Sequence, residues 1–256
     1  MAEAVMSRER TRFRYESDLV SVVRDALPRL AFRHDKNTDV EVFSEVPAVH
    51  GVPDLVGIRF DQARLKSRIE SGVRPLSTDA EVRVAMAIGD GCEIRAVGDR
   101  AGLSNEYARR NMLPLLTDLG WIESDGVGVV RRRPEAQWVA GRVVTIEAKL
   151  RDWRKALVQA RRQRLSGDAA YIAVDALAMQ GLSPYLARLA EEGIGAIAVD
   201  AERERAVVLS RPVRIGGTRR EAGRNLLSER CLGMLDRGTH EGQIYPVFGW
   251  TLPPAT

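Results

Sequence analysis

The chain has 256 residues, of which 45% are hydrophobic and 29% charged, and its formal net charge is +4. This is the composition of a soluble globular protein with room for one large domain or two small ones. No run approaches the ~18–20 apolar residues of a membrane span, so a membrane partner is not expected. Residues 1–14 lack the apolar segment of a secretory signal, and Cys92 and Cys231 lack metal-ligand spacing. We therefore expect a reduced, cytoplasmic protein without structural zinc.

The charge is distributed unevenly. Between Arg131 and Arg164 there are eleven arginines and lysines and three acids, a local charge of +8 that leaves −4 for the rest of the chain. Such a basic block favours a polyanion such as nucleic acid as partner, although arginine-rich helix faces can also simply be solvated. Only four of the 39 basic residues are lysines, so the lysine at position 149, within an apolar stretch, is conspicuous.

Hydrophobic periodicity predicts helices and strands on both sides of a long interval at 66–138. The first helix begins at Glu16, and Pro28 is expected to end it a residue or two early. Asp152 is expected to cap the helix that follows the third strand. The predicted elements outside the interval are, in order, a helix at 16–30, strands at 39–46, 54–60 and 142–150, a helix to about 165, a strand at 170–174, a helix at 183–192, strands at 195–199 and 205–209, and a helix at 219–235. This order predicts an α/β or α+β fold.

Residues 66–138 show a different order of predicted elements from the rest of the chain. Helices are predicted over 77–88, 93–101 and 104–119, the first with a capping box formed by Thr78 and Glu81 and the third kinked at Pro114. A β-hairpin around an Asp-Gly turn is predicted over 121–130. In this order of elements the chain resembles a winged helix-turn-helix module, which covers about residues 75–134.

Within this resemblance, polar and basic residues lie at the start of the candidate recognition helix and after the wing. The first group is Ser104, Asn105, Glu106, Arg109 and Arg110, and the second is Arg131, Arg132 and Arg133. The resemblance implies base-edge contacts for the first group and phosphate contacts for the second, with DNA as partner. The alternative is that the small domain mediates dimerisation or packs on the core, since many such modules contact proteins.

The stretch Val144-Thr-Ile-Glu-Ala-Lys-Leu150 predicts a buried strand interrupted by one acid and one base. Glu147 and Lys149 are two residues apart, so both side chains point to the same face. Burying them is costly unless they are paired or hold a metal. Asp54, at the start of another apolar strand, is a candidate second carboxylate for the same site. The alternative is an ion pair inside a sheet that has no activity.

With the interval set aside, the two flanking halves resemble the PD-(D/E)xK nuclease-like superfamily, also called restriction-endonuclease-like. Pro53-Asp54 matches its first motif and Glu147-Ala148-Lys149 its second, over roughly residues 14–200 without the insert. The resemblance implies a mixed central sheet flanked by helices. The expected parts are 1–74 and 137–215 for the core, 75–136 for the insert, and 216–256 for a C-terminal helix and tail.

Hydrolysis of a phosphodiester needs charge neutralisation and a nucleophile at neutral pH. Asp54 and Glu147 can hold Mg²⁺ (or Mn²⁺), a hard cation that favours carboxylates and lowers the pKa of bound water. Lys149 can orient that water or stabilise the developing charge. The resemblance implies a further metal ligand, the Ala148 carbonyl. Glu16 resembles an acidic residue that many relatives add to the metal site, but it equally fits a helix N-terminus favoured by the dipole.

The helix after the Glu-Ala-Lys strand carries further candidates. Gln159 occupies the place where some relatives have a Gln-x-x-x-Tyr pattern, and Gln163 replaces the tyrosine of that subgroup. Basic residues continue from the site onto this helix, where they either grip the DNA backbone or solvate an exposed face; they are Arg151, Arg154, Lys155, Arg161, Arg162 and Arg164.

The leading functional hypothesis is a metal-dependent DNA endonuclease in which the inserted winged helix positions the duplex. The alternative is a catalytically inactive nuclease-like DNA-binding protein or regulator, and a third is a protein-interaction module within a repair or defence complex. Because one site cuts one strand, double-strand cleavage would favour a homodimer.

Overall fold

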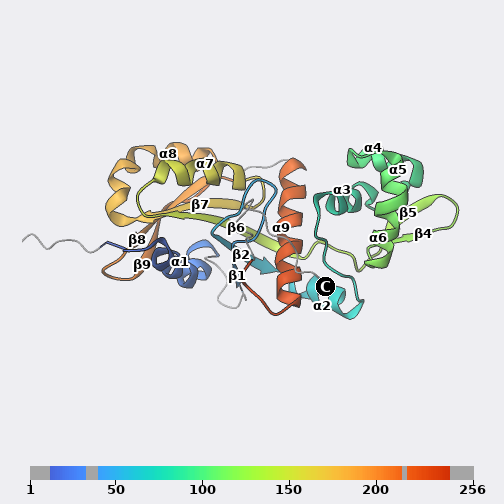
Figure 1. The fold of residues 1–256 in the computed structure, drawn as a ribbon, viewed down its shortest axis with the longest axis horizontal. Coiled ribbons are helices and arrows are strands. Elements are labelled where there is room, and N and C mark those ends of the chain that lie inside the picture. The colour runs from blue at the N-terminus through green and yellow to red at the C-terminus, as the bar shows by residue number, and fades with distance from the viewer. Residues whose placement is uncertain (1–11, 33–39, 215–217, 243–256) are drawn as a thin grey trace, which may run out of the picture.

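A computed structural model describes residues 12–32, 40–214 and 218–242 (Figure 1). The N-terminal stretch 1–11, the beginning of the strand predicted at 39–46 and the predicted tail at 243–256 lie outside these residues. The described chain is a mixed α/β protein with a six-stranded sheet flanked by helices.

The central sheet has the strand order β1-β2-β6-β7-β8-β9. Its strands are β1 (Val40–Ser44), β2 (Leu55–Phe60), β6 (Ala140–Lys149), β7 (Ala169–Asp175), β8 (Ile194–Asp200) and β9 (Arg205–Ser210). β6, β7 and β8 are parallel to one another, and the other neighbours are antiparallel. The three parallel strands therefore end at the same edge of the sheet, the edge where ligands bind in many α/β proteins.

Helices cover both faces of the sheet (Figure 1). They are α1 (Glu16–Ala31) on one face and α7 (Trp153–Gln163), α8 (Leu186–Glu191) and α9 (Thr218–Asp236) on the other. Leu19 of α1 shares a buried cluster with Ile146 of β6, whereas Leu157 of α7 shares one with Ile172 of β7. None of the helices in the described ranges combines the length and apolar character needed to cross a membrane.

The prediction that Pro28 ends the first helix early is wrong. The helix α1 continues through Pro28 to Ala31. Leu27 and Ala31 are buried on either side of the proline. Their burial under the sheet outweighs the loss of one backbone hydrogen bond, because tertiary packing commonly overrides local propensity.

After β2, α2 (Gln62–Glu70) packs through Leu65 into an apolar cluster of the large sheet. The residues from α3 to β5 form a second, smaller body. Its elements are α3 (Asp79–Ile88), β3 (Cys92–Glu93), η1 (Ile94–Ala96), α4 (Val97–Ala101), α5 (Asn105–Tyr107), η2 (Ala108–Met112), α6 (Leu113–Asp118), β4 (Ile122–Ser124) and β5 (Val129–Arg132). The strands form a separate sheet of order β3-β5-β4. The predicted capping box of Thr78 and Glu81 is present in α3. The helix predicted from residue 93 starts later, because Glu93 pairs with β5.

The third predicted helix is a continuous run of α5, η2 and α6, and η2 has π-helical geometry. The wide turn at Ala108–Met112 directly precedes Pro114, which has no N–H to donate to the preceding turn. The kink expected at Pro114 therefore takes the form of a π-bulge in the preceding turn.

The helix α9 links the two bodies, and it lies between them in Figure 1. Leu226 of α9 belongs to the apolar cluster of the smaller body, and its neighbour Leu227 belongs to a cluster of the large sheet. Next to them, Arg68 of α2 donates two hydrogen bonds to Glu229 of α9, at 2.6 and 3.0 Å. Both side chains are almost fully buried, so α2 and α9 are held together by an ion pair that water does not screen.

Candidate functional site

Paired strand ends bring the predicted carboxylates together. Leu55 of β2 lies opposite Ile146 of β6 in antiparallel register, so Asp54 faces Glu147 where β2 begins. The Oδ2 atom of Asp54 accepts a hydrogen bond from the Ala148 N–H at 2.6 Å. Backbone pairing therefore fixes the position of one carboxylate relative to the other.

The ammonium group of Lys149 lies at the centre of the cluster. Its Nζ atom is 2.7 Å from Oε1 of Glu16, 3.2 Å from Oε1 of Glu147 and 3.7 Å from Oδ2 of Asp54. It also donates to the Ala148 carbonyl at 2.7 Å. Three elements, α1, β2 and β6, therefore deliver three carboxylates and one carbonyl to a single cation.

Gln163, at the last turn of α7, orients the deepest carboxylate. Its Nε2 atom donates to Oε2 of Glu147 at 2.7 Å, and both side chains are only 1% exposed. Gln159, the residue predicted for the site, lies one turn earlier on α7. The Oε1 atom of Gln159 is buried and has no hydrogen-bond partner in the described residues. Gln163 follows Gln159 by four residues, and residues four apart lie on the same face of a helix. This spacing is the sequence signal that indicates Gln163 as a second candidate on that face.

Burial and neighbouring charge perturb the titration of the cluster. Burial, reinforced by the negative charge of Asp54, raises the pKa of Glu147 to about 7, and the hydrogen bond from Gln163 only partly opposes it. Burial likewise raises the pKa of Asp54, against the lowering effect of the Ala148 N–H. Burial alone would lower the pKa of Lys149, but its carboxylate neighbours together raise it above its usual value. The ammonium is therefore charged at neutral pH, whereas Glu147 titrates there.

The donors of the cluster have the chemistry of magnesium ligands, since carboxylates and the Ala148 carbonyl are hard oxygen ligands. In the described part of the chain, no three His, Cys, Asp or Glu side chains are grouped closely enough to hold a metal. The carboxylates instead surround Lys149, which also occupies the Ala148 carbonyl. Oε1 of Glu147 is buried and accepts no well-aligned hydrogen bond. Asp54, Glu147 and the Ala148 carbonyl therefore suit the expected metal in donor type, and Lys149 would have to release them.

Two of the predicted DNA-contacting residues have structural partners inside the smaller body. The Ser104 hydroxyl accepts from the Tyr107 N–H at 3.1 Å and caps α5. Oδ1 of Asn105 accepts from the Gly98 N–H at 2.9 Å and so closes the turn between α4 and α5. A Cβ atom on Gly98 would lie 2.6 Å from the Asn105 backbone, so this close crossing requires glycine.

The predicted basic contacts of the smaller body are mainly exposed. Arg109 and Arg131 extend into solvent, while Arg110 pairs with Glu106 at 3.0 Å on the helix surface. Arg132 and Arg133 are half-buried, and Arg133 lies 3.6 Å from Glu135. Of the predicted contacts in this body, Arg109, Arg110 and Arg131 therefore carry exposed charge.

A second group of predicted contacts lies close to the cluster. Arg151, Arg154 and Lys155 follow β6 and begin α7, and all three are exposed. Asp152 caps α7 by accepting from the Lys155 N–H at 3.0 Å, as predicted. The Arg154 guanidinium lies over the ring of Trp153, 4.5 Å from its centroid. Positive charge therefore continues from Lys149 onto the surface of the molecule.

Comparison with known proteins adds no family to this description. No protein-family model and no curated protein matches the chain.

Proposed function

We propose that this protein is a metal-dependent DNA endonuclease whose catalytic fold is of the PD-(D/E)xK type. The observation that carries the proposal is the convergence of Glu16, Asp54 and Glu147 on Lys149, at the ends of adjacent strands. An acidic cluster with one central lysine and hard oxygen donors suits the hydrolysis of a phosphodiester. A purely structural ion pair would need only one of these carboxylates.

Each residue of the cluster has a distinct role in the proposed reaction. A divalent metal held by Asp54, Glu147 and the Ala148 carbonyl would polarise the phosphate and lower the pKa of a bound water. The protein's own groups prepare this site: the Ala148 N–H fixes Asp54, and Gln163 fixes Glu147. Lys149 keeps its proton, and its ammonium group would point at the reacting oxygens. There it would stabilise the negative charge that develops during the reaction.

The smaller body supports a role in placing the DNA. Three helices followed by a hairpin agree with a winged helix-turn-helix, and the arginines at 109 and 131 present unburied charge to a partner. Phosphate contacts from such residues position a duplex without reading its sequence. The rigid connection through Arg68 and Glu229 would transmit that placement to the cleavage site.

The test is cleavage of plasmid, linear duplex and single-stranded DNA with Mg²⁺, Mn²⁺ or EDTA. Wild type should cut in metal and not in EDTA, and Lys149→Ala should lose roughly a thousandfold or more in rate, as expected when a preorganised electrostatic group is removed. Lys66→Ala is the matched control, because Lys66 is an exposed lysine on α2 whose ion pair among the described residues is with Glu70. Metal-independent or absent cutting on all three substrates contradicts the proposal.

A second candidate is a catalytically inactive DNA-binding protein. The observation that favours it is that Lys149 already lies among the carboxylates and offsets part of their negative charge. In that case Lys149→Ala lowers stability but leaves DNA binding unchanged, and adding Mg²⁺ has no effect on either property. Salt-dependent binding without cleavage would support this candidate.

A further inference from the structure

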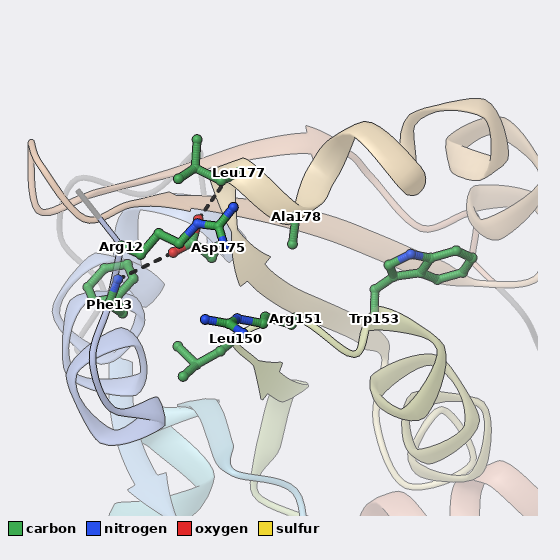
Figure 2. Close-up of a pocket in the computed structure, with 8 residues that line it drawn as sticks. All are labelled: Arg12, Phe13, Leu150, Arg151, Trp153, Asp175, Leu177 and Ala178. Carbon is green, nitrogen blue, oxygen red and sulfur yellow. Dashed lines mark hydrogen bonds between the residues drawn. The ribbon is translucent and has the colours of Figure 1, made fainter. Parts of the chain in front are cut away.

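A pocket of about 260 Å³ opens at the carboxyl ends of β6 and β7 (Figure 2). Three segments distant in sequence form it. One precedes α1, the helix that carries Glu16, the second begins directly after Lys149, and the third starts where β7 ends. The lining residues are Arg12, Phe13, Leu150, Arg151, Trp153, Asp175, Leu177 and Ala178. Two of the three segments therefore continue directly from residues of the carboxylate cluster.

The lining combines apolar walls with isolated charges. Figure 2 shows Arg12, Phe13 and Asp175 on one side, Trp153 on the opposite side, and Arg151 between them. Both arginines are exposed, and neither guanidinium forms a hydrogen bond or ion pair with another described residue. Two uncommitted cations beside apolar walls suit a small flat ligand that carries a phosphate.

Asp175 supplies a directional acceptor at the inner end of the pocket. It ends β7 and is 5% exposed, and its two oxygens accept from the Phe13 N–H at 3.4 Å and the Leu177 N–H at 2.8 Å. A carboxylate has about four acceptor positions, so roughly two remain for a ligand. A base with two adjacent N–H donors would hydrogen-bond to both remaining positions. Thymine has a single ring N–H and could occupy only one of them.

We infer that this pocket binds one nucleotide, with its base between the apolar walls and its phosphate on Arg12 and Arg151. The base would donate to Asp175, which favours guanine, whose ring N–H and amino group lie side by side. The nucleotide is either an unpaired residue of the DNA substrate or a free mononucleotide. The first alternative rests on the proposed function and assigns the enzyme a substrate with unpaired bases, such as a strand end, since a base must leave the duplex to enter a pocket.

Binding of dGMP, dAMP, dCMP and dTMP should be measured by isothermal titration calorimetry in EDTA, so that cleavage plays no part. We expect dGMP to bind tightest and dTMP roughly tenfold or more weakly, about 1.4 kcal/mol. Asp175→Asn, which keeps the capping oxygen, should remove this preference, and Arg12→Ala should weaken all four nucleotides. Arg188→Ala, an exposed arginine on α8, is the matched control. No binding, or binding that Asp175→Asn leaves unchanged, overturns the inference.

A competition experiment separates the two sources of the nucleotide. A fluorescent duplex with a single-stranded guanine overhang is bound in EDTA and then challenged with dGMP. Displacement of the overhang duplex, but not of a blunt duplex, assigns the pocket to the DNA strand. Binding of dGMP without displacement assigns it to a free nucleotide. If dGMP binds but no DNA is cut in Mg²⁺, the nuclease proposal is wrong and the nucleotide pocket is supported. If DNA is cut but no nucleotide binds, the nuclease proposal is supported and the nucleotide pocket is wrong.

Discussion

The large sheet and the smaller body use charge in opposite ways. In the sheet, Lys149 and three carboxylates face one another, and their exposure ranges from the buried Glu147 to Glu16, whose side chain is 42% exposed. In the smaller body, residues such as Arg109 and Arg131 point into water. Withdrawn charges are expensive unless they are paired, whereas exposed charges cost little. Arg68 and Glu229 form one isolated buried pair, but Lys149 is shared by three carboxylates, which is more than a structural pair needs. The comparison teaches that the convergence of several charges, rather than burial alone, distinguishes the candidate site.

The largest expected effect concerns the ion pair that joins the two regions. Glu229→Ala leaves the Arg68 guanidinium buried without its carboxylate, and it also removes the acceptor of the Leu76 N–H at 3.1 Å. We expect a loss of about 3–5 kcal/mol in the free energy of unfolding, measured by urea denaturation. Glu70→Ala on the surface of α2 is the control and should cost little. A loss under 1 kcal/mol would mean that the two regions are not coupled through this pair.

Next in size is the contribution of the smaller body's arginines to DNA affinity. Replacing Arg109, Arg131 and Arg132 by alanine should weaken duplex binding roughly tenfold to a hundredfold at low salt. The slope of log K against log salt should also fall by about 0.9 for each lost phosphate contact. Filter binding between 50 and 200 mM salt measures both quantities. The control replaces Arg188, Arg203 and Arg205, which lie on α8 and in or near β9. Equal losses of affinity in the two triple variants would contradict the proposal that the smaller body binds the DNA.

A third effect, of roughly 1–3 kcal/mol, is the pH dependence of stability that Glu147 confers. Because the pKa of Glu147 is raised from 4.5 to about 7, the folded protein binds its proton more tightly than the unfolded chain. Wild type should therefore lose stability as pH rises through this window, and Glu147→Gln should lose less. Urea denaturation of both proteins from pH 5 to 8 in EDTA checks the sign. Parallel pH profiles would show that this carboxyl titrates normally.

The smallest expected effect separates structure from recognition at Asn105. Because its Oδ1 accepts from the part-buried Gly98 N–H, Asn105→Ala should cost about 1 kcal/mol, the net contribution of one hydrogen bond. Asn105→Asp keeps the acceptor and should cost less. Thermal denaturation measures the loss, and selection of bound sequences from a random DNA pool measures specificity. A changed sequence preference with unchanged stability would restore the base-contact role predicted for this residue.

Much of the fold follows from local sequence signals. The apolar strands at 142–150 and 170–174, the capping box at Thr78 and the Asp152 cap were all predictable, because each depends on a few neighbouring residues. The helix α2 was missed because its segment is mostly polar. Its Arg68 is buried against Glu229, 161 residues later in the chain, and no local pattern can reveal such a partner.

The candidate site was predictable in part for the same reason. Glu147 and Lys149 are conspicuous because charges rarely interrupt a buried strand, and their convergence with Asp54 follows from strand pairing. The contact from Gln163 and the pocket at Asp175 depend on how a helix and a loop pack against the sheet. These features come from tertiary packing, which sequence periodicity does not encode residue by residue.

The most direct measurement of the central claim is DNA cleavage by Asp54→Asn alongside wild type, in Mg²⁺ and in EDTA. Asparagine keeps the size of the side chain and an oxygen for the Ala148 N–H, so the strand pairing survives while the carboxylate charge is lost. We predict metal-dependent cutting by wild type and at least a thousandfold lower rate for Asp54→Asn, with an unchanged circular dichroism spectrum. Equal cutting by the two proteins would contradict the assignment of this cluster as the active site.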